Sequence, residues 1–137
     1  MNILFVCRHN RFRSKVAEAV FNKINKESRY KAKSAGIIKG VPVAAIVKKI
    51  AKENGFSIKG NPTSLSEELM SWADIFVIVA DDVPVSIFER YKKYGKKVIV
   101  WKIKDVSQTD EKSISKIFLE IKKKVEIFER GLDKKRK

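Results

Sequence analysis

Short apolar segments alternate with amphipathic helical segments along the chain, and this alternation restricts the fold more than any other feature. The predicted strands lie at residues 2–6, 30–34, 74–80 and 97–102, and the predicted helices at residues 14–26, 43–54, 66–72, 84–94 and 114–132. Strands that alternate with helices typically form a parallel sheet with helices on both faces. We therefore expect a single α/β domain with three layers.

Residues that start or stop helices support these limits. Ser66 precedes two glutamates, as at a helix N-terminus. Gly55 and Gly95 follow helical segments and are expected to end them. The last helix is expected to be capped by Thr109 or Asp110.

Polar residues that can do chemistry follow several predicted strands. They are Cys7, Asp81, Asp82 and Asp105. Ligands of open parallel sheets bind at the carboxyl ends of the strands. We therefore expect these side chains to lie along one edge of the sheet.

Length and composition set the broad class. A chain of 137 residues with 44% hydrophobic and 34% charged residues is typical of one soluble globular domain. No apolar run approaches the ~20 residues of a membrane-spanning helix, and the N-terminus lacks the features of a secretory signal. We therefore expect a cytoplasmic protein without a membrane partner. The single cysteine excludes an internal disulfide, and the single histidine argues against a Cys/His zinc site.

The chain is strongly basic, with 31 Lys and Arg against 16 Asp and Glu and a formal net charge of +15. Such a charge attracts phosphorylated molecules, RNA and other anions. Most of the excess is lysine on helical segments and in a basic tail at residues 133–137, which favours a solvated surface over a dedicated nucleic-acid interface. Aromatic residues do not alternate with the basic ones as a base-stacking platform requires. Nucleic-acid binding stays open as a minor alternative.

The segment CRHNRFRS at residues 7–14, here called the Cys7 loop, joins the first strand to the first helix. Backbone N–H groups of such a loop converge on one point, and the helix dipole adds positive potential there, so a tetrahedral oxyanion fits. Arg13 can hold two oxygens of that anion with its planar guanidinium. The same field favours the thiolate of Cys7, and a thiolate is a nucleophile.

The other members of the loop have supporting roles in this interpretation. Ser14 can donate its hydroxyl to the Cys7 sulfur, and Asn10 tolerates the left-handed backbone that a tight loop needs. Arg8 and Arg11 are expected to be solvent-facing or rim charges, and His9 a turn residue. The expected oxyanion-binding residues are Arg8, His9, Asn10, Arg11, Phe12, Arg13 and Ser14.

The cysteine, five residues, arginine, serine spacing resembles the phosphate loop of cysteine-dependent phosphatases. More narrowly, the chain resembles the low-molecular-weight protein tyrosine phosphatase family, which includes related arsenate reductases. The resemblance rests on ILFVCxxNxxRSxxAEAxF at the front, SAG at residues 34–36, the segment 64–80 and Asp105 before the last helix. It implies a four-stranded parallel sheet in the order 2-1-3-4, with a phosphatase-like domain over residues 1–132.

Roles follow from the resemblance for the matching residues. Cys7 would form a phosphocysteine intermediate, Arg13 would stabilise the transferring group, and Asp105 would be the general acid and then the base. Ser14 would stabilise the departing thiolate, while Asn10 and Ser34 would brace the loop. No metal or other cofactor is expected, because the loop and the arginine supply the positive field. Asp81 and Asp82 remain rivals of Asp105, since they also follow a strand.

The sequence departs from the family pattern at three places. His9 stands where the family usually has glycine, Phe12 where it often has a second cysteine, and Val106 where it has proline followed by aromatic residues. Positive φ at position 9 would make His9 crowd the loop. A phosphotyrosine ring packs against such an aromatic wall, so the sequence supports phosphatase chemistry more directly than a preference for phosphotyrosine.

Three functions follow from these patterns. The first is a metal-independent phosphatase acting on phosphorylated proteins or small aryl phosphates, expected to be a monomer and to bind phosphate, sulfate or vanadate. The second is an arsenate reductase that uses an external thiol or a glutaredoxin-like partner, because the chain lacks the further cysteines of the thioredoxin-coupled form. The third is a non-catalytic module that binds phosphate groups or nucleic acid.

Overall fold

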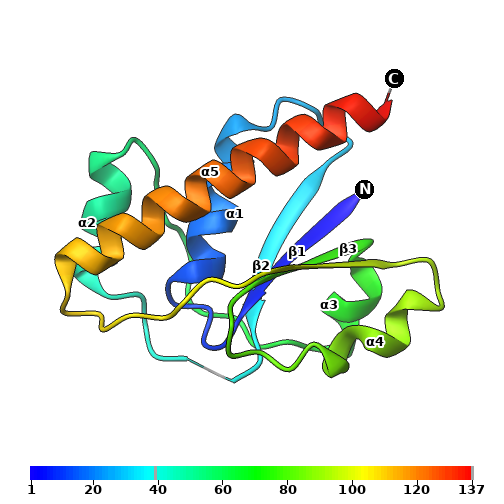
Figure 1. Cartoon of the computed structure of the whole chain (residues 1–137), viewed down its shortest axis with the longest axis horizontal. Coiled ribbons are helices and arrows are strands. Elements are labelled where there is room, and N and C mark those ends of the chain that lie inside the picture. The colour runs from blue at the N-terminus through cyan, green and yellow to red at the C-terminus, as the bar shows by residue number, and fades with distance from the viewer. Residues whose placement is uncertain (39, 137) are drawn as a thin grey trace.

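The computed structural model of the chain describes residues 1–38 and 40–136. Its centre is a four-stranded sheet in the order β2-β1-β3-β4 (Figure 1). The strands are β1 Asn2–Cys7, β2 Lys31–Gly36, β3 Ile75–Val79 and β4 Lys97–Trp101. All neighbouring strands are parallel. The predicted fold class and strand order are therefore confirmed.

The described residues also form five helices, four of them between strands and α5 after β4, each at a predicted position. They are α1 Arg13–Ile24, α2 Ala45–Glu53, α3 Glu67–Trp72, α4 Ser86–Lys92 and α5 Glu111–Arg136. Most ends differ from the prediction by one to three residues, but α5 continues past Leu132, through the start of the expected basic tail. Residues 133–136 include no proline or glycine that would stop a helix. Lys137 lies outside the described residues.

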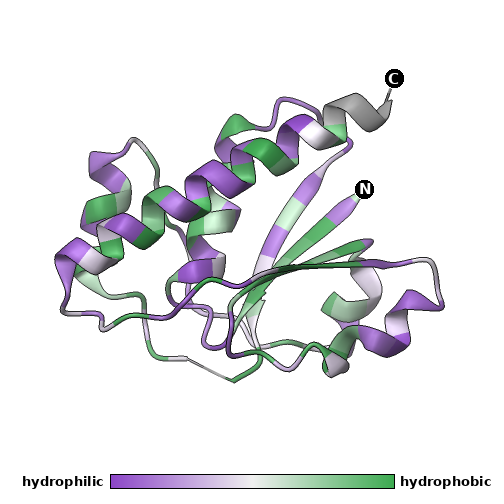
Figure 2. Ribbon diagram, viewed as in Figure 1, coloured by the Kyte–Doolittle hydropathy of each residue, from purple (hydrophilic) through white to green (hydrophobic). Residues whose placement is uncertain are grey.

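The two faces of the sheet carry two separate hydrophobic clusters. Along β1, Ile3 and Phe5 join one cluster and Leu4 and Val6 join the other, because successive side chains of a strand point to opposite faces. The first cluster packs against α1, α2 and α5, and the second against α3 and α4, on opposite sides of the sheet (Figure 1). Both β1 and β3 are therefore apolar along nearly their whole length, and α5 carries alternating apolar and polar stripes (Figure 2).

Helix ends follow the predicted signals. Ser66 caps α3, because its Oγ accepts the N–H of Leu69 at 3.2 Å. Thr109 and Asp110 were the two candidate caps for α5. Asp110 is the cap, because its Oδ1 accepts the N–H of Ser113 at 3.1 Å. Gly55 and Gly95 have φ values of 86° and 82°, which glycine adopts without strain. Over the described ranges, no helix combines the length and the apolar character that crossing a membrane requires.

Candidate active site

The Cys7 loop lies between the end of β1 and the start of α1, at the carboxyl edge of the sheet. Cys7 is the last residue of β1 and Arg13 the first residue of α1. Asn10 has the positive φ, 54°, that its type suggested, and it is the one non-glycine residue with positive φ in the described part of the chain. The histidine at position 9 is therefore free of the backbone strain that a positive φ would have imposed.

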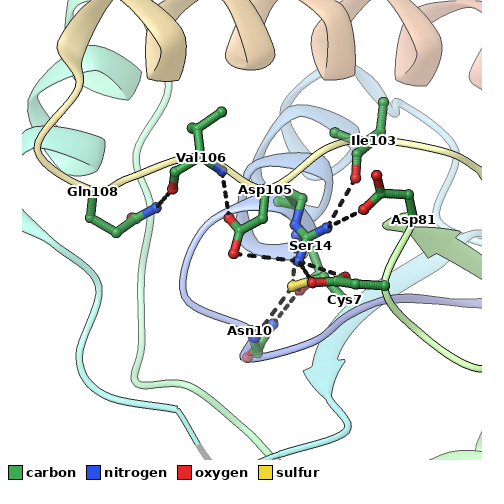
Figure 3. A network of polar contacts seen from close by, with 10 residues as sticks. Cys7, Asn10, Ser14, Asp81, Ile103, Asp105, Val106 and Gln108 are labelled. Atoms are coloured by element: carbon green, nitrogen blue, oxygen red, sulfur yellow. Dashed lines mark hydrogen bonds and ion pairs between the residues drawn. The ribbon is translucent and has the colours of Figure 1, made fainter.

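Cys7 is a buried residue, 2% exposed, and three donors surround its sulfur. The backbone N–H groups of Asn10 and Ser14 lie 3.3 and 3.5 Å from Sγ, and the Ser14 hydroxyl lies 2.9 Å away (Figure 3). Hydrogen bonds strengthen when the acceptor is ionised, and the N-terminus of α1 adds a favourable dipole. The surroundings of the sulfur therefore stabilise negative charge on it.

Asn10 and Ser14 form a small polar network that fixes the loop. The Asn10 side chain donates from Nδ2 to Ser14 Oγ at 2.8 Å and accepts the N–H of Thr63 at 2.8 Å through Oδ1. Because Ser14 Oγ already accepts from Asn10, its own proton is available for the Cys7 sulfur. The contacts support the predicted bracing role of Asn10 and the predicted donor role of Ser14.

Two glycines pack against the outer side of the loop backbone. A Cβ on Gly36 would lie 2.7 Å from the carbonyl carbon of His9 and 2.8 Å from the backbone nitrogen of Asn10, closer than real Cβ atoms approach. A Cβ on Gly40 would collide with the carbonyl oxygen of His9. Gly36 is part of the SAG motif, but no sequence motif includes Gly40, because a close contact between distant backbone segments leaves no local pattern in the sequence.

Ser34 was also expected to support the Cys7 loop, but the side-chain hydrogen bond described for it is to α1 and not to the loop. Its Oγ donates to Glu18 Oε1 at 2.5 Å, about one helical turn beyond Ser14 on α1. Its backbone lies beside Phe5 in the β1–β2 pairing. Any support that Ser34 gives to the Cys7 loop therefore passes through α1 and β1, and the bracing role stays a prediction.

Arg13 is held where the ends of β3 and β4 approach the loop. The side chain is 2% exposed, and Nη1 donates to the carbonyl oxygen of Ile103 at 3.0 Å. Nη2 lies 3.0 Å from Asp82 Oδ1, and Asp81 and Asp105 approach the guanidinium to 3.9 and 3.8 Å. The expected gathering of Cys7 and the three aspartates at one edge is thus present. Asp82 serves there as the nearest ion-pair partner of Arg13.

A cavity of about 260 Å³, here called the Cys7 pocket, opens over the loop. Its walls are formed by Cys7, His9, Arg11, Phe12, Arg13, Asp105, Val106, Ser107 and Gln108. Asp105 is 42% exposed and accepts the N–H of Val106 through Oδ1 at 3.0 Å. Figure 3 shows its carboxylate between Val106 and the Cys7–Ser14 pair. Asp81 and Asp82 are not part of this wall, so Asp105 is the aspartate best placed to reach a group bound at Cys7.

The walls of the Cys7 pocket are mostly polar or aliphatic. Among the described lining residues Phe12 is the one Phe, Tyr or Trp; it is 2% exposed and belongs to the first core cluster. Val106 is half-buried, and Gln108 Nε2 donates to its carbonyl oxygen at 3.0 Å. His9 and Arg11 are half-buried in the wall, whereas Arg8 is exposed and outside it. Within residues 1–38 and 40–136, no group of three or more His, Cys, Asp or Glu side chains is arranged to hold a metal ion.

The parallel sheet and the Cys7 loop define the class of α/β enzymes whose cysteine and arginine lie on a phosphate-binding loop between a strand and a helix. The family described as low molecular weight phosphotyrosine protein phosphatase matches residues 2–137. The chain belongs to this family. No curated protein matches the chain.

Solved structures with the same fold come from phosphatases and arsenate reductases. An arsenate reductase from Archaeoglobus fulgidus is 31% identical, with a TM-score of 0.76, over 93% of this chain and 98% of that one. A low molecular weight protein tyrosine phosphatase from T. tengcongensis is 27% identical, with a TM-score of 0.79, over 92% and 95% of the two chains. The YwlE arginine phosphatase from Geobacillus stearothermophilus has a TM-score of 0.85 over 98% and 94%; at 22% identity it shows the fold alone.

Proposed function

We propose that the protein is a metal-independent phosphatase that hydrolyses phosphotyrosine or similar aryl phosphate monoesters through a phosphocysteine intermediate. One observation carries this proposal: Asp105 lines the same small pocket as Cys7 and Arg13, although it lies far along the sequence from the loop that carries those two residues. A nucleophile, a fixed cation and a carboxyl group facing one cavity are what phosphoryl transfer needs.

In the first step, the Cys7 thiolate attacks phosphorus and forms the S–P bond, while the P–O bond to the leaving group breaks. Asp105, protonated at this stage, gives its proton to the departing oxygen. Arg13 and the backbone N–H groups of the loop bind the other phosphoryl oxygens. The guanidinium has several N–H donors, so Ile103 and Asp82 can hold it in place while others reach the substrate.

In the second step, water attacks the phosphocysteine and the S–P bond breaks. The carboxylate of Asp105 takes a proton from that water, and inorganic phosphate forms. The Ser14 hydroxyl and the backbone N–H groups of Asn10 and Ser14 stabilise the departing thiolate by hydrogen bonds. Each group thus returns to its starting protonation state.

The aryl substrate class is supported by family membership and by the T. tengcongensis relative, which is named a protein tyrosine phosphatase. A phenol oxygen is also a good leaving group once it is protonated. The pocket has room for an aromatic ring but has no exposed aromatic wall among its lining residues. Selection among aryl phosphates must therefore come from its polar groups.

Hydrolysis of 4-nitrophenyl phosphate and of a phosphotyrosine peptide, measured as released phenol and phosphate, tests this function. We expect turnover without added metal, competitive inhibition by vanadate, and loss of activity in Cys7→Ala protein. Binding of these phosphates without turnover by the wild-type protein would overturn the enzymatic proposal and favour a non-catalytic phosphate-binding module.

Arsenate reduction is a second candidate, favoured by the 31% identity to the A. fulgidus arsenate reductase. Arsenate would add to the Cys7 sulfur with loss of water. An external thiol would then attack that sulfur, forming a mixed disulfide and releasing arsenite, and a second external thiol would restore Cys7. External thiols are required because the chain has a single cysteine. Oxidation of a low-molecular-weight thiol that depends on both arsenate and the protein would support this reaction, and its absence would contradict it.

A further inference from the structure

Arg11 is a cation of the Cys7 pocket without a partner. Among the described residues its buried Nε has no hydrogen-bond partner, and none of the ion pairs involves its guanidinium. Buried polar groups of native proteins are nearly always hydrogen-bonded, so the unmatched donor of Arg11 indicates a position that an acceptor atom of a ligand fills.

The carboxylates near the site are grouped around Arg13, not around Arg11. Asp82, Asp105 and Asp81 lie 3.0, 3.8 and 3.9 Å from Arg13, and Asp105 also accepts the N–H of Val106. The charge of Arg13 is thus compensated before any substrate arrives, whereas the charge of Arg11 is not. An uncompensated guanidinium beside a pocket attracts an anion.

The phosphoryl group being transferred does not need Arg11. It must lie against the Cys7 sulfur, where the N–H groups of Asn10 and Ser14 already converge and where the helix dipole points. Arg13 adds its fork of N–H donors to that position. The guanidinium of Arg11 is therefore left for a different part of the same substrate.

We propose that Arg11 binds a second anionic group of the substrate, a carboxylate or a phosphate adjacent to the phosphoryl group that Cys7 attacks. This inference rests on the proposed phosphatase function. A planar guanidinium matches either anion with paired hydrogen bonds. His9 lines the same wall, and its ring N–H is a second donor there. Such a group occurs on a phosphopeptide with an acidic neighbouring residue and on a small phosphate that carries another acid.

Matched pairs of substrates distinguish a phosphopeptide from a small phosphate as the molecule that carries the second anionic group. One pair is a phosphotyrosine peptide with Asp or Asn beside the phosphotyrosine, and the other is 3-carboxyphenyl phosphate against phenyl phosphate. We expect kcat/KM to be higher for the charged member, and Arg11→Gln to reduce that preference about tenfold, or ~1.4 kcal/mol. The preference should also weaken at high salt, because screening acts on the added charge. If the charged member is preferred in only one of the two pairs, that pair shows whether the substrate is a phosphopeptide or a small phosphate with a second acid group.

Arg8→Gln is the matched control. It removes the same charge from a neighbouring loop residue that is exposed and outside the pocket wall, so the preference should persist even where the overall rate changes. Equal losses for charged and neutral substrates in Arg11→Gln would overturn the inference, as would an equal effect of Arg8→Gln on the preference.

A binding measurement keeps the inference testable apart from catalysis. Titration calorimetry of Cys7→Ala protein should give tighter binding of 3-carboxyphenyl phosphate than of phenyl phosphate, and Arg11→Gln should remove the difference. Equal affinities would refute the role of Arg11 even if the enzyme hydrolyses aryl phosphates. A difference in affinity without wild-type turnover would instead refute the proposed function and support the second anion site.

Discussion

Arg13 and Asp82 form an ion pair with 3.0 Å between Nη2 and Oδ1, although one begins α1 and the other follows β3. The Arg13 side chain is 2% exposed and that of Asp82 is 29% exposed. A cation buried this deeply needs a partner, since an unpaired buried charge is strongly unfavourable. The pair therefore fixes the guanidinium beside the Cys7 loop before substrate binds.

Replacing Asp82 tests this positioning role. We expect Asp82→Asn to lower the free energy of unfolding by about 1–2 kcal/mol, less than for a fully buried pair because Asp82 is partly solvated and Asp81 and Asp105 remain near Arg13. It should also raise KM for aryl phosphates. Asp81→Asn is the control, since Asp81 is 43% exposed and 3.9 Å from Arg13. Denaturant unfolding that gives equal losses for both variants would argue against a special role of Asp82.

The acid role of Asp105 predicts a dependence on the leaving group. Asp105→Asn should reduce kcat/KM for phenyl phosphate, which reports the step in which the leaving group departs, by about 10²–10⁴-fold, the usual contribution of a general acid. The loss should be much smaller for 4-nitrophenyl phosphate, whose leaving oxygen departs without a proton. Steady-state kinetics with both substrates measures this. Unchanged turnover of phenyl phosphate would move the acid role to Asp81, Asp82 or solvent.

Close packing of Gly36 against the Cys7 loop predicts that a methyl group there is harmful. Gly36→Ala would place Cβ 2.7 Å from the carbonyl carbon of His9, so we expect about 1–3 kcal/mol of destabilisation and a loss of phosphatase activity. Gly131→Ala on α5 is the control, because its Cβ would meet no atom within 4 Å. That variant should be stabilised by roughly 0.5–1 kcal/mol. Thermal unfolding of both proteins checks the contrast, and wild-type activity in Gly36→Ala would contradict it.

Asp110 at the start of α5 predicts a pH-dependent contribution to stability. Hydrogen bonds from the Ser113 hydroxyl and backbone N–H lower the pKa of Asp110 below 3.8. A carboxyl group with a depressed pKa in the folded state stabilises the protein above its unfolded pKa, and this stability is lost as the pH falls through the folded pKa. The stability difference between wild-type and Asp110→Ala protein should therefore be constant near neutral pH and shrink below about pH 4. A pH-independent difference would contradict this.

Local patterns were enough to predict the fold class and the centre of the site, whereas the strand order was implied by the family resemblance. The alternation of strands and helices predicts the parallel sheet, and the spacing from Cys7 to Ser14 predicts the loop that holds the sulfur. The backbone of Asn10 was also predictable, because few residue types adopt positive φ.

Contacts between distant segments were not predictable from those patterns. Arg13 binds the carbonyl of Ile103, 90 residues along the chain, and Asp82, 69 residues along. Such partners depend on how the loops after β3 and β4 turn back over the sheet, and no local periodicity encodes that. The partner of Ser34 was not predictable for the same reason, because the register of β2 places its hydroxyl beside Glu18 on α1.

The phosphocysteine intermediate is the central claim, and intact-protein mass spectrometry tests it most directly. Wild-type protein mixed with excess aryl phosphate and quenched in acid during turnover should carry one added phosphoryl group. Peptide mapping should place that group on Cys7, and Cys7→Ala protein treated in the same way should carry none. Steady hydrolysis by a wild-type protein whose Cys7 stays unmodified under these conditions would contradict the account.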